Sequence, residues 1–235
     1  MNQQDFITEL KQKGAVIVGF GDLSELSPDV RLGMPIGVCV AVKYPPEVIR
    51  DISALPTADY HDWYNKLNTL LDSIVTFGAE LLTREGYAAI AMTRDRVGNG
   101  EVDNNTSLPY KTIATRAGIG WIGKCALLIN DVFGSAIRLS AILTDAPFEA
   151  AAPVNESKCG DCMSCTNACP AGAVKGKSWS AGVNRDELVD APLCRRAARE
   201  RAHLGFSRAD VTICGKCIEI CPYTQRYLNQ MQPML

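Results

Sequence analysis

The sequence predicts an α/β (α+β) domain over residues 1–150, followed by a smaller cysteine-rich domain over residues 151–235. Apolar runs typical of buried strands alternate with amphipathic helix patterns in the first part. Eight of the ten cysteines follow residue 158. A segment rich in Pro and Ala, residues 146–157, separates the two parts as a linker does.

The first domain is expected to begin with a helix over residues 3–13, followed by buried strands that start at Ala15 and Ile36. One long amphipathic helix then runs between Asp59, which caps its start, and Gly86, which ends it. The remaining expected elements are a strand from Tyr87, a polar loop over residues 93–107, a short helix over residues 109–117, and strands from Cys125 and Ser135.

Composition favours a globular protein of the cytoplasm. The chain has 235 residues, 47% of them hydrophobic, and a formal net charge of −2. No apolar run approaches the roughly 18 residues of a membrane span, and the N-terminus lacks the apolar core of a signal peptide. Because cytosolic thiols are kept reduced, ten cysteines indicate metal binding rather than disulfides.

Two cysteine motifs identify the metal. Residues 159–170, CGDCMSCTNACP, match the bacterial ferredoxin run in which three thiolates hold one [4Fe–4S] cluster and the fourth reaches a second cluster. Residues 214–222, CGKCIEICP, supply the partner motif, and Cys194 supplies its missing ligand. The ferredoxin rule gives two ligand sets: Cys159, Cys162, Cys165 and Cys221 for one cluster, and Cys169, Cys194, Cys214 and Cys217 for the other.

Two zinc sites are the alternative, since paired C-x2-C elements also suit tetrahedral zinc. Zinc gives no reason for the close spacing that ends in Cys-Pro in both motifs, so we predict a bacterial ferredoxin-like domain with two [4Fe–4S] clusters. Cys39 and Cys125 are expected to be small buried apolar residues; a reactive thiol with a lowered pKa is the alternative at Cys125.

Residues 117–125, AGIGWIGKC, match the dinucleotide pattern G-x-G-x-x-G and most of a P-loop. Both nucleotide motifs need a strand before the glycines and a helix after them. Here the order is reversed, because the expected helix precedes the glycines and the expected strand follows. We therefore do not expect a nucleotide-binding loop. Two interpretations of residues 117–125 remain: a tight helix-to-strand turn, or a loop that faces another cofactor.

Residues 111–129, residues 134–149 and the cysteine motifs, in this order, resemble the epoxyqueuosine reductase family and its short relatives with a double [4Fe–4S] domain. That family is similar to reductive dehalogenases. The resemblance runs from about Tyr60 to Tyr223. It implies a nitroreductase-like or corrinoid-reductase-like α/β fold, and two clusters that deliver electrons one at a time to a base-off cobalamin.

The resemblance also places residues 117–124 on the loop that faces the cofactor. Glycines there let the backbone approach a flat ring closely, Trp121 offers an apolar face, and basic side chains suit its polar edges. The candidate cofactor-binding residues are Lys111, Arg116, Gly118, Gly120, Trp121, Gly123, Lys124 and Arg138. The alternative interpretation, a tight helix-to-strand turn with a buried Trp121, remains possible for this loop.

Two departures argue against a tRNA substrate. Family members that reduce epoxyqueuosine carry a proton-donating aspartate before this loop, where this sequence has Asn104. Asp103 is therefore the candidate catalytic residue, with a shift of register. The chain ends soon after Cys221, without the helical repeats that hold tRNA, and nucleic-acid affinity depends on clustered Lys and Arg. We expect no nucleic-acid partner.

The sequence thus predicts an iron-sulfur and cobalamin-dependent reductase acting on a small molecule or a protein-bound cofactor. Residues 159–235 carry 10 Lys and Arg against 7 Asp and Glu, so an acidic electron donor of ferredoxin or flavodoxin type is a candidate partner. A solvated helix face is the alternative for these basic residues. The alternative is an electron-transfer protein of ferredoxin type that docks on a partner enzyme or corrinoid protein and has no substrate chemistry of its own.

Overall fold

The computed structural model describes residues 1–97 and 106–230. The chain forms two compact units, each assembled from three stretches. Unit 1 comprises Met1–Lys43, Leu67–Gly120 and Arg138–Asn155, and unit 2 comprises Tyr44–Lys66, Trp121–Ile137 and Glu156–Leu235. The crossing at Asn155 lies inside the predicted linker. The other four crossings between the units, after residues 43, 66, 120 and 137, lie inside the predicted α/β domain. The sequence analysis expected one boundary, at residue 150, where the chain passes between the units five times.

Unit 1 is built on a four-stranded sheet with the order β1-β2-β6-β3. β1 and β2 pair antiparallel with Gly19 opposite Cys39, and β3 and β6 pair antiparallel with Ile90 opposite Leu143. The strands are β1 (Ile17–Asp22), β2 (Ile36–Lys43), β3 (Ala89–Met92) and β6 (Ile137–Thr144). Each of the four lies where an apolar run predicted a strand.

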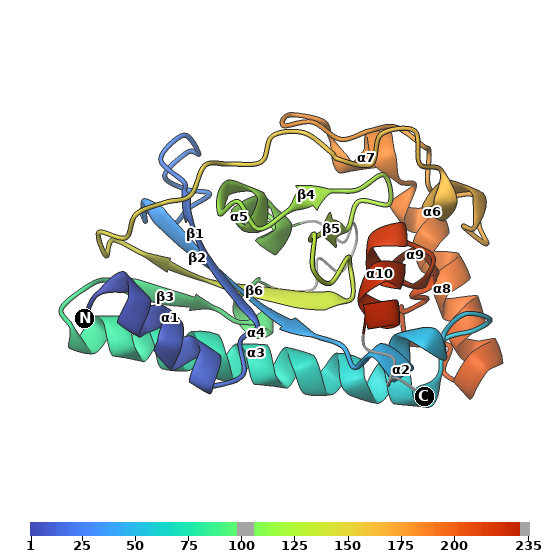
Figure 1. The fold of residues 1–235 in the computed structure, drawn as a ribbon, viewed down its shortest axis with the longest axis horizontal. Helices are drawn as coiled ribbons and strands as arrows, with labels where there is room; N and C mark the ends of the chain where they lie inside the picture. The colour runs from blue at the N-terminus through green and yellow to red at the C-terminus, as the bar shows by residue number, and fades with distance from the viewer. Residues whose placement is uncertain (98–105, 231–235) are drawn as a thin grey trace. The chain divides into compact units, whose positions relative to one another are not determined.

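Helices cover both faces of this sheet (Figure 1). On one face, Phe20 of β1 packs against Phe6 and Phe148, with ring centroids 6.5 and 4.7 Å away. Its neighbours Gly19 and Gly21 point to the opposite face, because side chains alternate along a strand. The helices of the first face are α1 (Gln3–Gln12) and the part of α3 (Ala58–Arg84) in unit 1, and that of the second is α5 (Tyr110–Arg116).

A short helix, α4 (Arg94–Val97), lies where the sequence predicted a polar loop. Asp72 of α3 explains it, because its carboxylate accepts hydrogen bonds from the Arg94 backbone N–H at 3.0 Å and from Arg94 Nε at 3.1 Å. This long-range contact fixes the first turn of α4. A sequence pattern with local signals alone does not reveal it.

Unit 2 contains a two-stranded hairpin and six helices within the described residues. The strand predicted from Cys125 shortens to Leu128–Ile129, because the chain turns over residues 123–127. None of the described helices combines the length and apolar character that crossing a bilayer requires. The elements are α2 (Pro46–Arg50), β4 (Trp121–Ile122), β5 (Leu128–Ile129), α6 (Ser164–Asn167), α7 (Arg185–Leu188), α8 (Ala191–Phe206), α9 (Lys216–Glu219) and α10 (Pro222–Gln230).

Hydrogen bonds explain why two early segments fold with the cysteine-rich part. The Tyr227 hydroxyl of α10 donates to the Tyr44 carbonyl at 2.8 Å, and the Tyr44 N–H donates to the Ala136 carbonyl at 2.9 Å. The Ser135 N–H donates to Thr224 Oγ1 at 3.1 Å. These groups are buried, so each bond satisfies polar atoms that water cannot reach.

We predict that Gly21→Ala destabilises unit 1 by about 3 kcal/mol, the upper end of the range for overpacking. A Cβ at Gly21 would lie 2.8 Å from Ala117 N and Arg116 C, which are backbone atoms and cannot rotate away. Gly33→Ala is the comparison: its Cβ meets nothing within 4 Å, and only its φ of +78° opposes the change, at about 1 kcal/mol. Thermal unfolding followed by far-UV circular dichroism under anaerobic conditions measures both. Equal destabilisation would contradict the packing of α5 on β1.

Candidate iron-sulfur centres

The eight predicted ligands lie in unit 2, in short helices and the turns between them. Cys165 lies in α6, Cys194 in the first turn of α8 and Cys217 in α9. Both C-x2-C turns place a glycine after the first cysteine, with φ of +50° at Gly160 and +75° at Gly215. Glycine adopts this backbone conformation without strain, so the two turns have the same local requirement.

Backbone N–H groups point at the sulfur of each cysteine that precedes a proline. The Ala173 N–H donates to Cys169 Sγ at 3.3 Å. Cys221 stands at the start of α10, where the N–H groups of Thr224 and Tyr223 donate to its sulfur. Burial raises the pKa of Cys221, and these donors oppose that rise. Such donors suit thiolates, and hydrogen bonds to sulfur help to set the potential of a bound cluster.

The cysteines that act electrostatically on Cys194 and on Cys221 belong to the same predicted ligand sets as these two residues. Cys165 and Cys217, which both hydrogen-bond with Cys125, belong to different sets. The pKa of Cys194 is raised first by burial and then by the nearby Cys169, Cys214 and Asp190. Cys159 is the cysteine that acts in the same way on Cys221. Cys194, Cys169 and Cys214 therefore lie together, as one predicted set requires, and Cys159 and Cys221 belong to the other.

Within residues 1–97 and 106–230, no three His, Cys, Asp or Glu side chains converge on a point that could hold one metal ion. Sulfurs bound to one zinc ion must lie within about 4 Å of one another, because Zn–S bonds are about 2.3 Å long. The ligands of a cubane need no such convergence, since each binds a different iron atom. Eight cysteines with ferredoxin spacing, two of whose sulfurs accept backbone N–H groups, are a donor set that fits [4Fe–4S] clusters.

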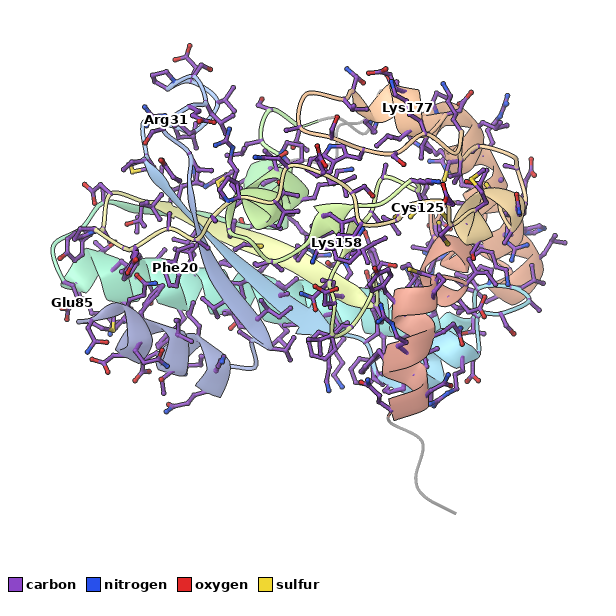
Figure 2. All side chains as sticks on the ribbon, turned by 45° about the horizontal axis from the view of Figure 1, so that its top comes forward. Phe20, Arg31, Glu85, Cys125, Lys158 and Lys177 are labelled. Carbon is purple, nitrogen blue, oxygen red and sulfur yellow. The ribbon has the colours of Figure 1, made fainter. Side chains whose placement is uncertain are left out.

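The end of the AGIGWIGKC loop lies against the first cysteine motif. A Cβ at Gly123 would lie 3.6 Å from Cys159 Sγ. Lys124 is only 5% exposed, and its Nζ lies 3.5 Å from Met163 Sδ. Cys125 lies among the sulfur atoms of unit 2 and hydrogen-bonds with Cys165 and Cys217 (Figure 2). Three consecutive loop residues therefore contact the cysteine-rich segment.

The sequence analysis did not predict that Cys125 lies beside the ligand cysteines Cys165 and Cys217. A hydrogen bond with Cys165 lowers the pKa of its thiol, but the hydrogen bond with Cys217, burial and the charge of Cys217 raise it well above the ordinary value. Burial and the Cys217 thiol therefore oppose the alternative of a lowered pKa at Cys125. No spacing signal could have placed Cys125 here, because only the fold brings its turn next to the cysteine motifs.

Trp121 is completely buried in unit 2. Its ring meets that of Tyr223 edge to face, with centroids 4.8 Å apart, and Lys158 Nζ lies 5.1 Å from its centroid. Its Nε1 has no hydrogen-bond partner in the described part of the chain. Trp121 thus joins β4 to the residues next to Cys159 and Cys221. Its predicted role toward a flat cofactor stays a prediction.

The other predicted cofactor-binding residues lie in unit 1. Arg116 donates to the Asp22 carbonyl at 3.1 Å and forms an ion pair with Glu25 at 3.0 Å. Gly118 has φ of +66°, and a Cβ there would lie 3.0 Å from the carbonyl oxygen of Ala152. These contacts give Gly118 a role in a tight turn. Lys111 is half-buried and Gly120 is buried.

Apart from Arg138, the members of a polar cluster in unit 1 escaped the sequence analysis. Arg138 of β6 donates through Nε and Nη2 to Asn68 Oδ1, at 3.1 and 3.0 Å. The Tyr110 hydroxyl donates to the Met92 carbonyl at 2.6 Å, and burial raises the pKa of Tyr110. Asn68 is a polar residue within the apolar stripe of α3, which was the available signal. The cluster consists of Asn68, Asp72, Arg94, Tyr110, Arg138 and Ser140.

The predicted catalytic residue, Asp103, lies outside the described residues, as does Asn104. In sequence, these two positions lie between Arg94 and Tyr110 of the polar cluster.

Comparison with known proteins identifies the relationship. Residues 158–224 match the family model described as a 4Fe-4S double cluster binding domain. An epoxyqueuosine reductase of Listeria monocytogenes is 45% identical over 125 residues, which are 52% of this chain and 32% of that protein. One from Bacillus subtilis is 31% identical over 116 residues, 49% of this chain and 26% of that protein. The predicted resemblance to epoxyqueuosine reductases is confirmed.

Solved structures extend the likeness to nearly the whole chain. An epoxyqueuosine reductase from Bacillus subtilis matches 95% of this chain and 65% of its own, with a TM-score of 0.60 and 20% identity. A catabolic reductive dehalogenase in complex with 3-bromo-4-hydroxybenzoic acid matches 93% of this chain and 31% of its own, with a TM-score of 0.68 and 16% identity. At these identities the likeness shows the fold.

The chain therefore combines a mixed α/β fold with a 4Fe-4S double cluster binding domain, and it is similar to epoxyqueuosine reductases in sequence and in fold. The chain spans about a third or less of the length of the two curated relatives, 32% and 26%.

We predict that Cys194→Ala removes about half of roughly eight iron atoms per chain, because the loss of one thiolate opens one of two clusters. Iron and sulfide analysis of anaerobically purified protein measures the loss. Cys39→Ala is the matched control, since Cys39 is fully buried in β2 and belongs to no predicted set. Equal iron contents in the two variants would exclude Cys194 as a ligand, and stoichiometric zinc would exclude the clusters.

Proposed function

We propose that this protein is an iron-sulfur reductase that passes electrons through two [4Fe–4S] clusters to a corrinoid held by its α/β unit. One observation carries the proposal. The fold matches both epoxyqueuosine reductases and a reductive dehalogenase whose structure concerns B12-dependent dehalogenation, the latter over 92% of this chain with a TM-score of 0.66 and 15% identity.

Polar groups of unit 1 suit the amide and phosphate edges of a corrinoid. Arg138 is held in place by Asn68, which is 2% exposed and whose Nδ2 has no hydrogen-bond partner within the described residues. A buried amide donor without a partner is costly, so the site is suited to a ligand that brings an acceptor. Lys111, Arg116 and Gly120 are the further residues of unit 1 that we propose to hold the cofactor.

The corrinoid, when bound, would supply a low-valent metal that reduces the substrate. The protein's part is to bind the cofactor, exclude water and supply a proton. We propose Asp103 as the proton donor, because a carboxylic acid can donate where the amide of Asn104 cannot.

The same reasoning points away from epoxyqueuosine in tRNA and toward a small molecule or a protein-bound cofactor. Counting back from Ala117 and Gly118, the resemblance implies that Asn104 falls at the position of the family aspartate. The chain carries a net charge of −2, whereas affinity for nucleic acid depends on clustered Lys and Arg. One solved structure shows an epoxyqueuosine reductase with an epoxyqueuosine-modified tRNA stem loop. That observation concerns the reductase in that structure.

We further propose that an acidic donor protein of ferredoxin or flavodoxin type docks on α8. Arg196 and Arg199 are exposed on this helix, and Cys194 lies in its first turn. Positive charge on the surface beside a cluster ligand steers an acidic partner to the place where electron transfer is short. We propose a cytoplasmic location, because cytosolic thiols are kept reduced.

An electron-transfer protein without its own substrate chemistry is the second candidate. A specific observation favours it: Trp121, Gly123 and Lys124, three of the predicted cofactor residues, contact the cysteine-rich segment of unit 2. If the remaining residues of unit 1 serve only turns, the α/β unit would be a docking platform.

We predict that anaerobically purified protein incubated with cobalamin retains a corrinoid through gel filtration, with the absorption spectrum of a base-off form. Arg138→Met should weaken this retention, because it removes the guanidinium beside Asn68, and should leave the iron content unchanged. Retention of iron-sulfur absorption alone by the unaltered protein would support the electron-transfer candidate.

We also predict that the chain does not restore queuosine to tRNA in cells that lack epoxyqueuosine reductase. Nucleoside analysis of bulk tRNA measures this, with a complete epoxyqueuosine reductase as the positive control. Restored queuosine would show that tRNA is a substrate.

A further inference from the structure

A buried lysine lies beside the first cysteine motif. The Nζ of Lys124 contacts Met163 Sδ at 3.5 Å, and Met163 stands between Cys162 and Cys165 in the chain. The side chain is almost fully buried, although lysine is rarely buried without a partner of opposite charge. Among the described residues, no carboxylate forms an ion pair with Lys124.

The turn between β4 and β5 holds this lysine in place. The Gly123 N–H donates to the Leu127 carbonyl at 2.8 Å, and the Ala126 N–H donates to the Gly123 carbonyl at 2.8 Å. Ala126 has φ of +59°, a left-handed conformation that residues with a Cβ rarely adopt. Strain of this kind persists only where the surroundings enforce it. The position of Lys124 is thus built into the hairpin.

A buried ammonium group must be compensated, because desolvation of an unpaired charge is costly. The thioether of Met163 is a weak acceptor and carries no charge. Four thiolates around a cubane leave a net negative charge, and reduction makes it more negative by one electron. Three ligands of one predicted cluster, Cys159, Cys162 and Cys165, lie next to residues 123–125 or Met163. Of the other set, only Cys217 is shown to neighbour this turn, through Cys125. The first cluster is therefore the main source of compensating charge.

We propose that Lys124 is the counter-charge of the cluster held by Cys159, Cys162, Cys165 and Cys221, and that it makes this cluster the more readily reduced of the two. A fixed positive charge favours the state with more negative charge, and burial limits screening by water and salt. The net charge around a cluster is one of the quantities that set its potential. The proposal rests on the two clusters and their ligand sets, and it is independent of a corrinoid.

The second ligand set has the opposite charge beside it. The Asp190 carboxylate acts electrostatically on Cys194, and its Oδ1 accepts the Leu193 N–H at 2.8 Å as the N-cap of α8. A negative charge disfavours reduction of a nearby cluster. The side chains beside the two clusters therefore make their reduction potentials differ, with the higher potential at the cluster beside Lys124. An electron shared between the clusters is found mainly on that cluster.

An anaerobic redox titration of the cluster-loaded chain, followed by electron paramagnetic resonance, tests this proposal. The unaltered protein is expected to show two separable midpoint potentials. Lys124→Met keeps the length of the side chain and removes its charge. It should lower the higher midpoint by at least about 59 mV, a tenfold change in a one-electron equilibrium, and should move the other midpoint less.

Two further variants complete the design. Lys158→Met is the control, because Lys158 is exposed, pairs with Asp131 and is screened by solvent, so both midpoints should stay close to those of the unaltered protein. Asp190→Asn keeps a good N-cap and should raise the lower midpoint.

Unchanged midpoints in Lys124→Met with full iron content would overturn the proposal, as would a single midpoint for both clusters in the unaltered protein. If Lys124→Met loses iron, Lys124→Arg decides, since it retains the charge and should keep both the iron and the separation of the two midpoints.

Discussion

Thiolate ligation of two clusters is the constraint on which unit 2 depends. A cubane needs four cysteine sulfurs around it, and here the ligands come from positions between 159 and 221 in the chain. Short helices, left-handed glycines and N–H donors place these sulfurs. The β4–β5 hairpin and the Tyr44 segment then surround them, through the contacts of Trp121 with Tyr223 and of Tyr44 with Tyr227. The early segments of unit 2 fold as they do because the cysteine motifs give them something to pack against.

Much of unit 1 could be predicted from local patterns. The four strands and the helices α1, α3 and α5 follow from apolar periodicity, which acts over a few positions. The predicted cap of the long helix is wrong, because α3 already includes Asp59 and Thr57 Oγ1 accepts the Tyr60 N–H. What the patterns could not show depends on distant partners. Asp72 fixes the start of α4, and the Gly123 and Ala126 hydrogen bonds turn a predicted strand into a hairpin loop. The interleaving of the two units is likewise a property of tertiary contacts.

The candidate site divides in the same way. Cysteine spacing carries enough chemistry to predict a double [4Fe–4S] domain, because each motif encodes a ligand geometry. The glycine-rich loop carried less information. Its residues split between a turn in unit 1 at Gly118 and a contact with the cysteine motif at Lys124, and nothing in the motif distinguishes these uses. Cys125 shows the limit most clearly, since an isolated cysteine has no spacing to interpret.

The interleaved course of the chain has a consequence for synthesis on the ribosome. Residues 44–66 and 121–137 emerge well before the last ligand, Cys221, yet they belong to the unit that contains it. Unit 1 likewise needs residues 138–155 for its sheet and its Phe148 contact. Domains usually fold in order as they leave the ribosome, but here neither unit can close early. Insertion of both clusters therefore follows the synthesis of Cys221, when both early segments of unit 2 have already left the ribosome.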